Sequence, residues 1–103
     1  MNLEEEIMQI ILFSGNAKSS AFEAIHAAKE NNHELAQECI EKANQELIQA
    51  HRVQTSLIQA EVRGEKTEIS LLLIHAQDHL MNSITFKDLA IEFVDLYRAV
   101  KKD

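Results

Sequence analysis

The chain has 103 residues, no proline and two glycines, a length that is typical of one domain. So few turn-forming residues argue against an all-β fold, and two isolated glycines cannot build the glycine-rich loop of a Rossmann or P-loop nucleotide site. The formal net charge of −7 disfavours nucleic acid as a ligand and favours a basic or mixed-charge protein partner. We therefore expect residues 1–103 to form a single helical domain.

The first predicted helix runs from about Leu3 to Asn31. Asn2 is expected to cap it, and an acidic first turn favours the helix dipole. Gly15 in mid-helix costs about 1 kcal/mol relative to alanine, so it indicates either close helix packing or a need for space at that turn. The stripe that faces the core becomes small after its second member, which lets a neighbouring helix approach closely. Its members are Ile7, Ile10, Ser14, Ala17, Ala21, Ala24 and Ala28.

The second predicted helix runs from about His33 to Val62, with Asn32 as its cap and Gly64 just beyond its end. One polar residue, Gln54, stands in its core stripe where an apolar residue is expected. The stripe consists of Ile40, Ala43, Leu47, Ala50, Gln54 and Leu57.

The third predicted helix runs from about Glu68 to Lys101, with Thr67 as its cap. Because only a few residues separate the three helices, successive helices must lie antiparallel, and we predict an all-α, up-down-up three-helix bundle. The core stripe of the third helix consists of Ile69, Leu73, Ala76, Leu80 and Ser83.

A second stripe lies on another side of the third helix and consists of Leu71, Ile74, Asp78, Met81 and Thr85. A helix that is apolar nearly all round is buried nearly all round, and three helices cannot bury it alone. We therefore expect self-association through this stripe. Two carboxylates about 4 Å apart repel by about 4 kcal/mol at an effective dielectric constant near 20. Copies of Asp78 at such an interface require protonation, basic partners or a bound cation, unless Asp78 lies at the rim in water; the sequence leaves both possibilities open.

The segment from His75 to His79 concentrates the chemistry of the chain. His75 and His79 are four residues apart and share a helix face, and Asp78 flanks His75. One interpretation is a metallohydrolase, because a His-x-x-x-His pair resembles the inverted zincin pattern, which also needs a third ligand and a base. A second is structural, with half-buried, hydrogen-bonded histidines. The third is a nucleophilic imidazole that accepts and donates a group near neutral pH.

The sequence also bears on location. A single cysteine, Cys39, excludes an intrachain disulfide and fits a reducing compartment. The first residues lack the basic start of a signal peptide, and no uncharged apolar run approaches the ~20 residues of a membrane-spanning helix. We therefore expect a cytoplasmic protein that does not insert into the membrane.

Three segments resemble a known family. Residues 70–81, SLLLIHAQDHLM, closely resemble the signature of the lactose/cellobiose family of IIA components of the bacterial phosphoenolpyruvate-dependent sugar phosphotransferase system. Residues 11–21, ILFSGNAKSSA, resemble the Ser-Gly-x-Ala-Arg-Ser block of its first helix, with Lys18 where arginine is common. Residues 50–58, AHRVQTSLI, are similar to its Ala-His-x-x-Gln-Thr block. The order and spacing of the segments agree with the family over nearly the whole chain.

The resemblance implies a homotrimer that carries phosphate on His75. It implies that phospho-HPr is the donor, that a cysteine of the IIB component is the acceptor, and that a β-linked disaccharide is taken up. It also implies a central metal ion, usually Mg²⁺, shared by Asp78 from each subunit. Gln54 and His79 are candidates to hydrogen-bond the imidazole or the phosphoryl oxygens, with purely structural hydrogen bonding as the alternative. The rival function is a non-catalytic helical oligomerisation module whose histidines are structural.

Overall fold

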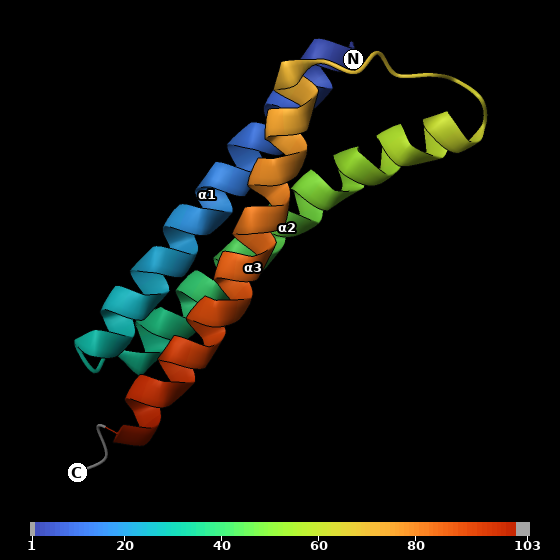
Figure 1. Ribbon diagram of the computed structural model, residues 1–103. Coiled ribbons are helices and arrows are strands. Elements are labelled where there is room, and N and C mark those ends of the chain that lie inside the picture. The colour runs from blue at the N-terminus through green and yellow to red at the C-terminus, as the bar shows by residue number, and fades with distance from the viewer. Residues whose placement is uncertain (1, 101–103) are drawn as a thin grey trace.

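The computed structural model describes residues 2–100, which form three α-helices. Helix α1 spans Leu3–Lys29, α2 spans His33–Val62 and α3 spans Leu71–Val100. Figure 1 shows that α1 and α3 run in the same direction. Helix α2, which lies between them in the sequence, runs in the opposite direction. The bundle is elongated, with extents of 58 × 20 × 19 Å. The predicted up-down-up bundle is therefore confirmed.

The predicted caps of the first two helices are confirmed. Asn2 Oδ1 accepts a hydrogen bond from the Glu5 backbone N–H at 2.8 Å, and Asn32 Oδ1 accepts one from the Leu35 N–H at 3.2 Å. Helix α1 ends two residues earlier than predicted. The reason is that Asn31 adopts a φ of 65°, a left-handed conformation that stops a right-handed helix and that asparagine tolerates better than most residues.

The predicted start of the third helix is wrong by one turn. Helix α3 begins at Leu71, because Ser70 Oγ accepts a hydrogen bond from the Leu73 backbone N–H at 3.1 Å and so caps the helix. Thr67 does not cap it, and Glu68 lies in the connection that precedes it. Serine and threonine are both good caps, so residue type alone does not choose between the two positions.

One further detail of the predicted third helix changes with its start. Ile69, which we expected on the core stripe, precedes the helix and is 76% exposed. The predicted end at Lys101 lies outside the described residues. The remaining members of the core stripe are buried or half-buried as predicted: Leu73, Ala76, Leu80 and Ser83.

Helix α1 is central to the core, since it packs against both other helices, whereas α2 and α3 have the least extensive contact. Its predicted inward stripe is buried along its whole length. The small side chains of this stripe let the backbones of the helices approach closely. The predicted stripe of α2 is also buried, except for the half-buried Leu57. Both predicted core stripes are thus confirmed.

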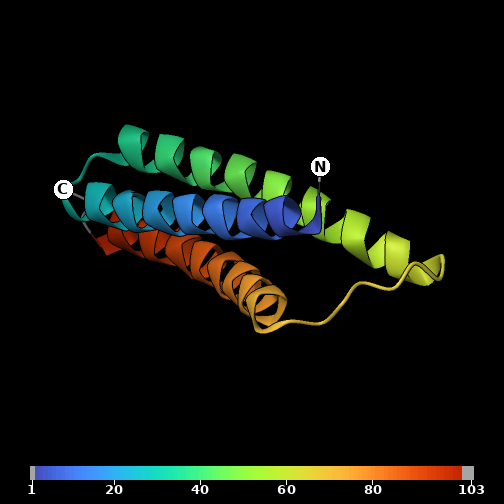
Figure 2. The same cartoon turned by 90° about the horizontal axis from the view of Figure 1, so that it is seen from above.

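The end of α2 leaves the bundle. Gln54 is the last buried residue of α2, and Figures 1 and 2 show the following turns diverging from α1 and α3. Ile58 and Val62 on these turns are exposed. Residues 63–70 then return to the start of α3, which lies near the start of α1 (Figure 1). Ile58 and Val62 are consequently apolar surface that one chain does not cover.

Helix α3 carries apolar side chains on two opposite sides, one in the core and one exposed. Even so, no helix within residues 2–100 combines the length and the apolar character needed to cross a membrane.

Candidate functional site

His75 and His79 lie one turn apart on the same face of α3. Their rings are parallel within 5°, with centroids 5.9 Å apart. His75 is exposed and His79 is half-buried. The predicted sharing of a face is therefore confirmed, and the more accessible of the two imidazoles is His75.

His79 is held between α3 and the backbone of α1. A Cβ placed on Gly15 would lie 3.5 Å from His79 Nε2, so the glycine marks the point where α1 passes this ring. The pKa of His79 is lowered, first by burial and then by the charges of His75 and Lys18, while Asp78 opposes the shift. His79 is consequently a neutral imidazole at neutral pH, with one ring nitrogen free to accept a hydrogen bond.

Beyond His79, toward the C-terminal end of α3, three aromatic rings and one lysine lie side by side. The Lys18 ammonium lies 5.9 Å from the centroid of the Phe86 ring. The Phe22 ring packs between Phe86, at 5.4 Å, and His26, at 5.5 Å. These residues come from α1 and α3 alone. The two parallel helices therefore present a continuous surface on which His75 and His79 lie at one end.

Gln54, the predicted polar residue in the core stripe of α2, donates a hydrogen bond from Nε2 to Gln77 Oε1 on α3. At about 100° per residue, Gln77 lies on the opposite flank of α3 from His75. Gln54 therefore joins α2 to α3 at the last level where the two helices pack. A hydrogen bond from Gln54 to the His75 imidazole is not among those formed within the described residues, and that contact stays a prediction.

Asp78 is an exposed carboxylate on α3. Its Oδ2 accepts a hydrogen bond from Asn82 Nδ2 at 3.2 Å, which fixes the side chain along the helix and leaves Oδ1 available. Carboxylate oxygens are the ligands that Mg²⁺ prefers. Within residues 2–100 of one chain, however, no three His, Cys, Asp or Glu side chains gather closely enough to hold a metal ion. A metal at Asp78 therefore requires carboxylates from further copies, and the metallohydrolase interpretation finds no third ligand there.

The apolar stripe around Asp78 extends further along α3 than the sequence analysis predicted. Leu71, Ile74 and Met81 are exposed as that prediction requires. Four further apolar residues continue the same side of the helix to its end, at the three- and four-residue spacing that follows Thr85. The predicted stripe did not include them. They are Leu89, Phe93, Leu96 and Val100.

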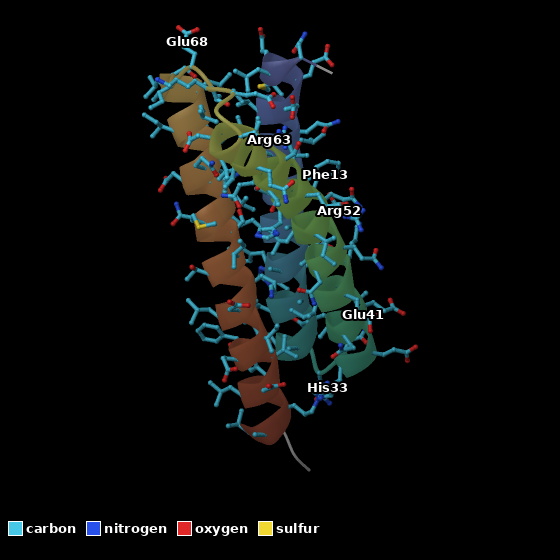
Figure 3. The ribbon with its side chains drawn as sticks, turned by 90° about the vertical axis from the view of Figure 1, so that its right-hand side faces the viewer. Phe13, His33, Glu41, Arg52, Arg63 and Glu68 are labelled. Atoms are coloured by element: carbon cyan, nitrogen blue, oxygen red, sulfur yellow. The ribbon has the colours of Figure 1, made fainter. Side chains whose placement is uncertain are left out.

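The other singled-out residues lie away from this site. Cys39 is a buried free thiol whose pKa is raised, first by burial and then by the nearby Glu23 carboxylate, so it behaves as a small core residue. Figure 3 shows Arg52 and Glu41 pointing from α2 away from α3. Arg52 and Glu41 therefore do not face the helix that carries His75.

The arrangement defines a class of protein. An exposed imidazole on a rigid helix, backed by a neutral second imidazole, is suited to accept and release a group. The family model of the "PTS system, Lactose/Cellobiose specific IIA subunit" matches residues 5–98. The chain belongs to this family, and is thus a IIA component of the sugar phosphotransferase system.

Individual relatives agree. The lichenan-specific phosphotransferase enzyme IIA component of Bacillus subtilis is 53% identical over 95% of this chain and 89% of the relative. The N,N'-diacetylchitobiose-specific EIIA component of Escherichia coli is 38% identical over 96% of this chain and 85% of the relative.

Solved structures share the fold. The cellobiose-specific enzyme IIA from Bacillus anthracis superimposes with a TM-score of 0.94 at 55% identity, over 98% of this chain and 94% of that chain. The IIA(Chitobiose)–HPr complex from Escherichia coli contains a chain that matches with a TM-score of 0.87 at 36% identity, over 99% of both chains.

Proposed function

We propose that this protein is a phosphohistidine carrier that receives a phosphoryl group from phospho-HPr on His75 and passes it to the cysteine of its IIB component. The observation that carries the proposal is the exposed His75 imidazole in the family signature, on a helix shared with the half-buried His79. The structure of a related IIA–HPr complex supports HPr as the donor. The relay operates in the cytoplasm during uptake of a β-linked disaccharide of the lactose, cellobiose or chitobiose type.

Both transfers use the lone pair of one His75 ring nitrogen. In the first, this nitrogen attacks the phosphorus of phospho-HPr, the phosphorus–nitrogen bond of the donor breaks, and its electrons return to the donor imidazole. In the second, the thiolate of the IIB cysteine attacks the phosphorus and the electrons return to His75. Such transfers pass through a loose, in-line transition state, so positioning and charge stabilisation supply most of the catalysis.

His79 and Gln54 support His75 in different ways. His79 is neutral because of the lowered pKa described above, so it adds no charge beside the phosphoryl group and offers a hydrogen bond to the imidazole or to a phosphoryl oxygen. Gln54 acts through Gln77, because the hydrogen bond between their side chains holds α2 against the part of α3 that carries His75.

The carrier works as a homotrimer packed through α3. The exposed stripe of α3 runs from Leu71 to Val100, about 45 Å at 1.5 Å per residue, and a single chain leaves it in water. The Asp78 copies then meet at the symmetry axis and share one divalent cation, Mg²⁺, through their carboxylates. The cation neutralises their repulsion.

Reconstitution tests this function. The protein is incubated with phosphoenolpyruvate, the general phosphotransferase enzyme and HPr, and its intact mass is measured before and after acid treatment. We expect an acid-labile gain of one phosphate in the native protein and in His79→Gln, and none in His75→Gln. If His75→Gln is labelled and His79→Gln is not, the proposed assignment of the phosphorylation site to His75 is wrong. A native protein that takes up no phosphate would favour the oligomerisation module.

A further inference from the structure

Lys18 is the one permanent cation in the stretches of α1 and α3 that flank the two histidines. Between Leu3 and Ala28 on α1, and between Leu71 and Phe86 on α3, the sequence contains no other lysine or arginine. Helices α1 and α3 are parallel neighbours (Figure 1), so these two stretches form the surface around His75 and His79.

The ammonium group of Lys18 is not engaged by an acid. Among the described residues, no carboxylate lies within 4.0 Å of it, although the chain carries a net charge of −7. It rests instead against Phe86, 5.9 Å from the ring centroid, and Phe22 holds that ring from the side of α1. A cation–π contact with the half-buried Phe86 ring is weak, so a more highly charged anion can draw the ammonium group away.

The helix geometry sets the distance that Lys18 must span to a group on His75. Gly15 lies beside His79, and Lys18 follows Gly15 by three residues while His75 precedes His79 by four. Because the helices are parallel, the two backbone positions are offset by about 10 Å along the bundle at 1.5 Å per residue. The lateral spacing of packed helix axes, about 8–10 Å, adds to this offset, so Lys18 reaches a group on His75 with its flexible four-carbon stem extended. The charge of Lys18 already acts on His79, one turn from His75.

We propose that Lys18 is a positioning residue that turns from the Phe86 ring toward the phosphoryl group on His75 and stabilises the phosphorylated state of the carrier. The proposal rests on the proposed function. The phosphoryl group brings about two negative charges to a chain that is already acidic, and Lys18 offsets part of that repulsion. Lys18 makes and breaks no bond.

The equilibrium of the first transfer tests this role. Phospho-HPr and the protein are allowed to equilibrate, and the phosphate on each is measured by intact mass. This equilibrium constant depends only on the separated proteins, so any contribution of Lys18 to docking leaves it unchanged. We expect Lys18→Met and Lys18→Gln to shift it toward phospho-HPr by about threefold to tenfold at low salt, as expected for one partly screened charge pair.

Two comparisons separate charge from structure. Lys18→Arg restores the native equilibrium, and the shift in Lys18→Met shrinks at high salt because the interaction is screened. Lys66→Met is the matched control, since it removes the same charge from an exposed position in the connection before α3 and leaves the equilibrium unchanged. Thermal unfolding of each variant shows that it is folded.

Several results would overturn the role of Lys18. They are an equilibrium within twofold of native in both neutral variants, an equal shift in Lys66→Met, or a shift that salt does not reduce. If the native protein takes up no phosphate, the proposed function itself fails; if the native protein is labelled and Lys18→Met has the native equilibrium, only the inference about Lys18 fails.

Discussion

At His79, the neighbours act on the ring in opposing directions. Burial against α1, His75 and Lys18 all lower its pKa, and only Asp78 raises it. Gly15 lies where the α1 backbone passes Nε2, and a Cβ at this position would be 3.5 Å from that atom, in ordinary contact. Gly15 and His79 are each recognisable in the sequence, but no spacing rule relates two residues on different helices.

The lowered pKa of His79 predicts how stability depends on pH. The protonated form is less favourable in the fold than in the unfolded chain, so the free energy of unfolding decreases as pH falls through the ordinary histidine pKa of about 6.5 and recovers above it. We expect urea unfolding to give a smaller rise in stability between pH 5 and 7 for His79→Gln than for the native protein. Identical slopes for the two proteins would contradict this prediction.

Other residues of the site show what the sequence leaves out. His75, His79 and Asp78 share a turn of one helix, so their relation followed from helical periodicity. Gln54 was recognised as a polar residue in an apolar stripe, yet its partner Gln77 was not. The partner depends on how far α2 slides along α3, which is set by packing and not by the sequence of either helix.

The glycines show how one residue type acts differently in two elements. Gly15 lies within α1, where alanine has a higher helix propensity than glycine. The methyl group of an alanine at this position would make an ordinary contact of 3.5 Å with His79. Gly64 follows α2 with a φ of 88°, a conformation in which any Cβ is strained.

We therefore expect Gly15→Ala to stabilise the fold by about 1 kcal/mol and Gly64→Ala to destabilise it by about 1 kcal/mol. Urea unfolding of the two variants against the native protein measures both effects, and Gly64→Ala is the matched control for the Gly15 substitution. A destabilised Gly15→Ala would show that α1 and α3 approach more closely at His79 than the structure has them.

At the level of whole helices, prediction succeeded where periodicity is long and failed at a boundary. The core stripes of α1 and α2 followed from spacing alone. The start of α3 did not, because Thr67 and Ser70 are equivalent caps by residue type. The connection must reach back from the diverging end of α2 (Figure 2), and that distance, which is a tertiary property, leaves Ser70 as the cap.

In a single chain, one apolar side of α3 is exposed to water along the length of the helix. This exposed side predicts that the protein self-associates. Light scattering should give a mass near three times 11.7 kDa. The apolar residues on either side of Asp78 supply the free energy, so a clean monomer at micromolar concentration would contradict both the trimer and the role of this stripe.

Asp78 should make the assembly depend on a metal ion. A chelator is expected to loosen the native trimer, because it removes the cation that offsets the repulsion among the carboxylates. Asp78→Leu removes the repulsion and the cation together, so its trimer should resist the chelator and be more stable by about 1–4 kcal/mol. Phosphorylation of His75 should survive this substitution. A folded Asp78→Leu trimer that takes up no phosphate would instead show that Asp78 orients the imidazole.

The central claim is that the phosphate on His75 is an intermediate and not an end product. The protein is phosphorylated, freed of HPr and the general enzyme, and mixed with its IIB component, and the phosphate on each protein is followed by intact mass. We predict that the phosphate leaves His75 and appears in equal amount on the IIB cysteine, with no transfer to a IIB variant that lacks this cysteine. Loss of the phosphate to water at the same rate with and without IIB would contradict the account.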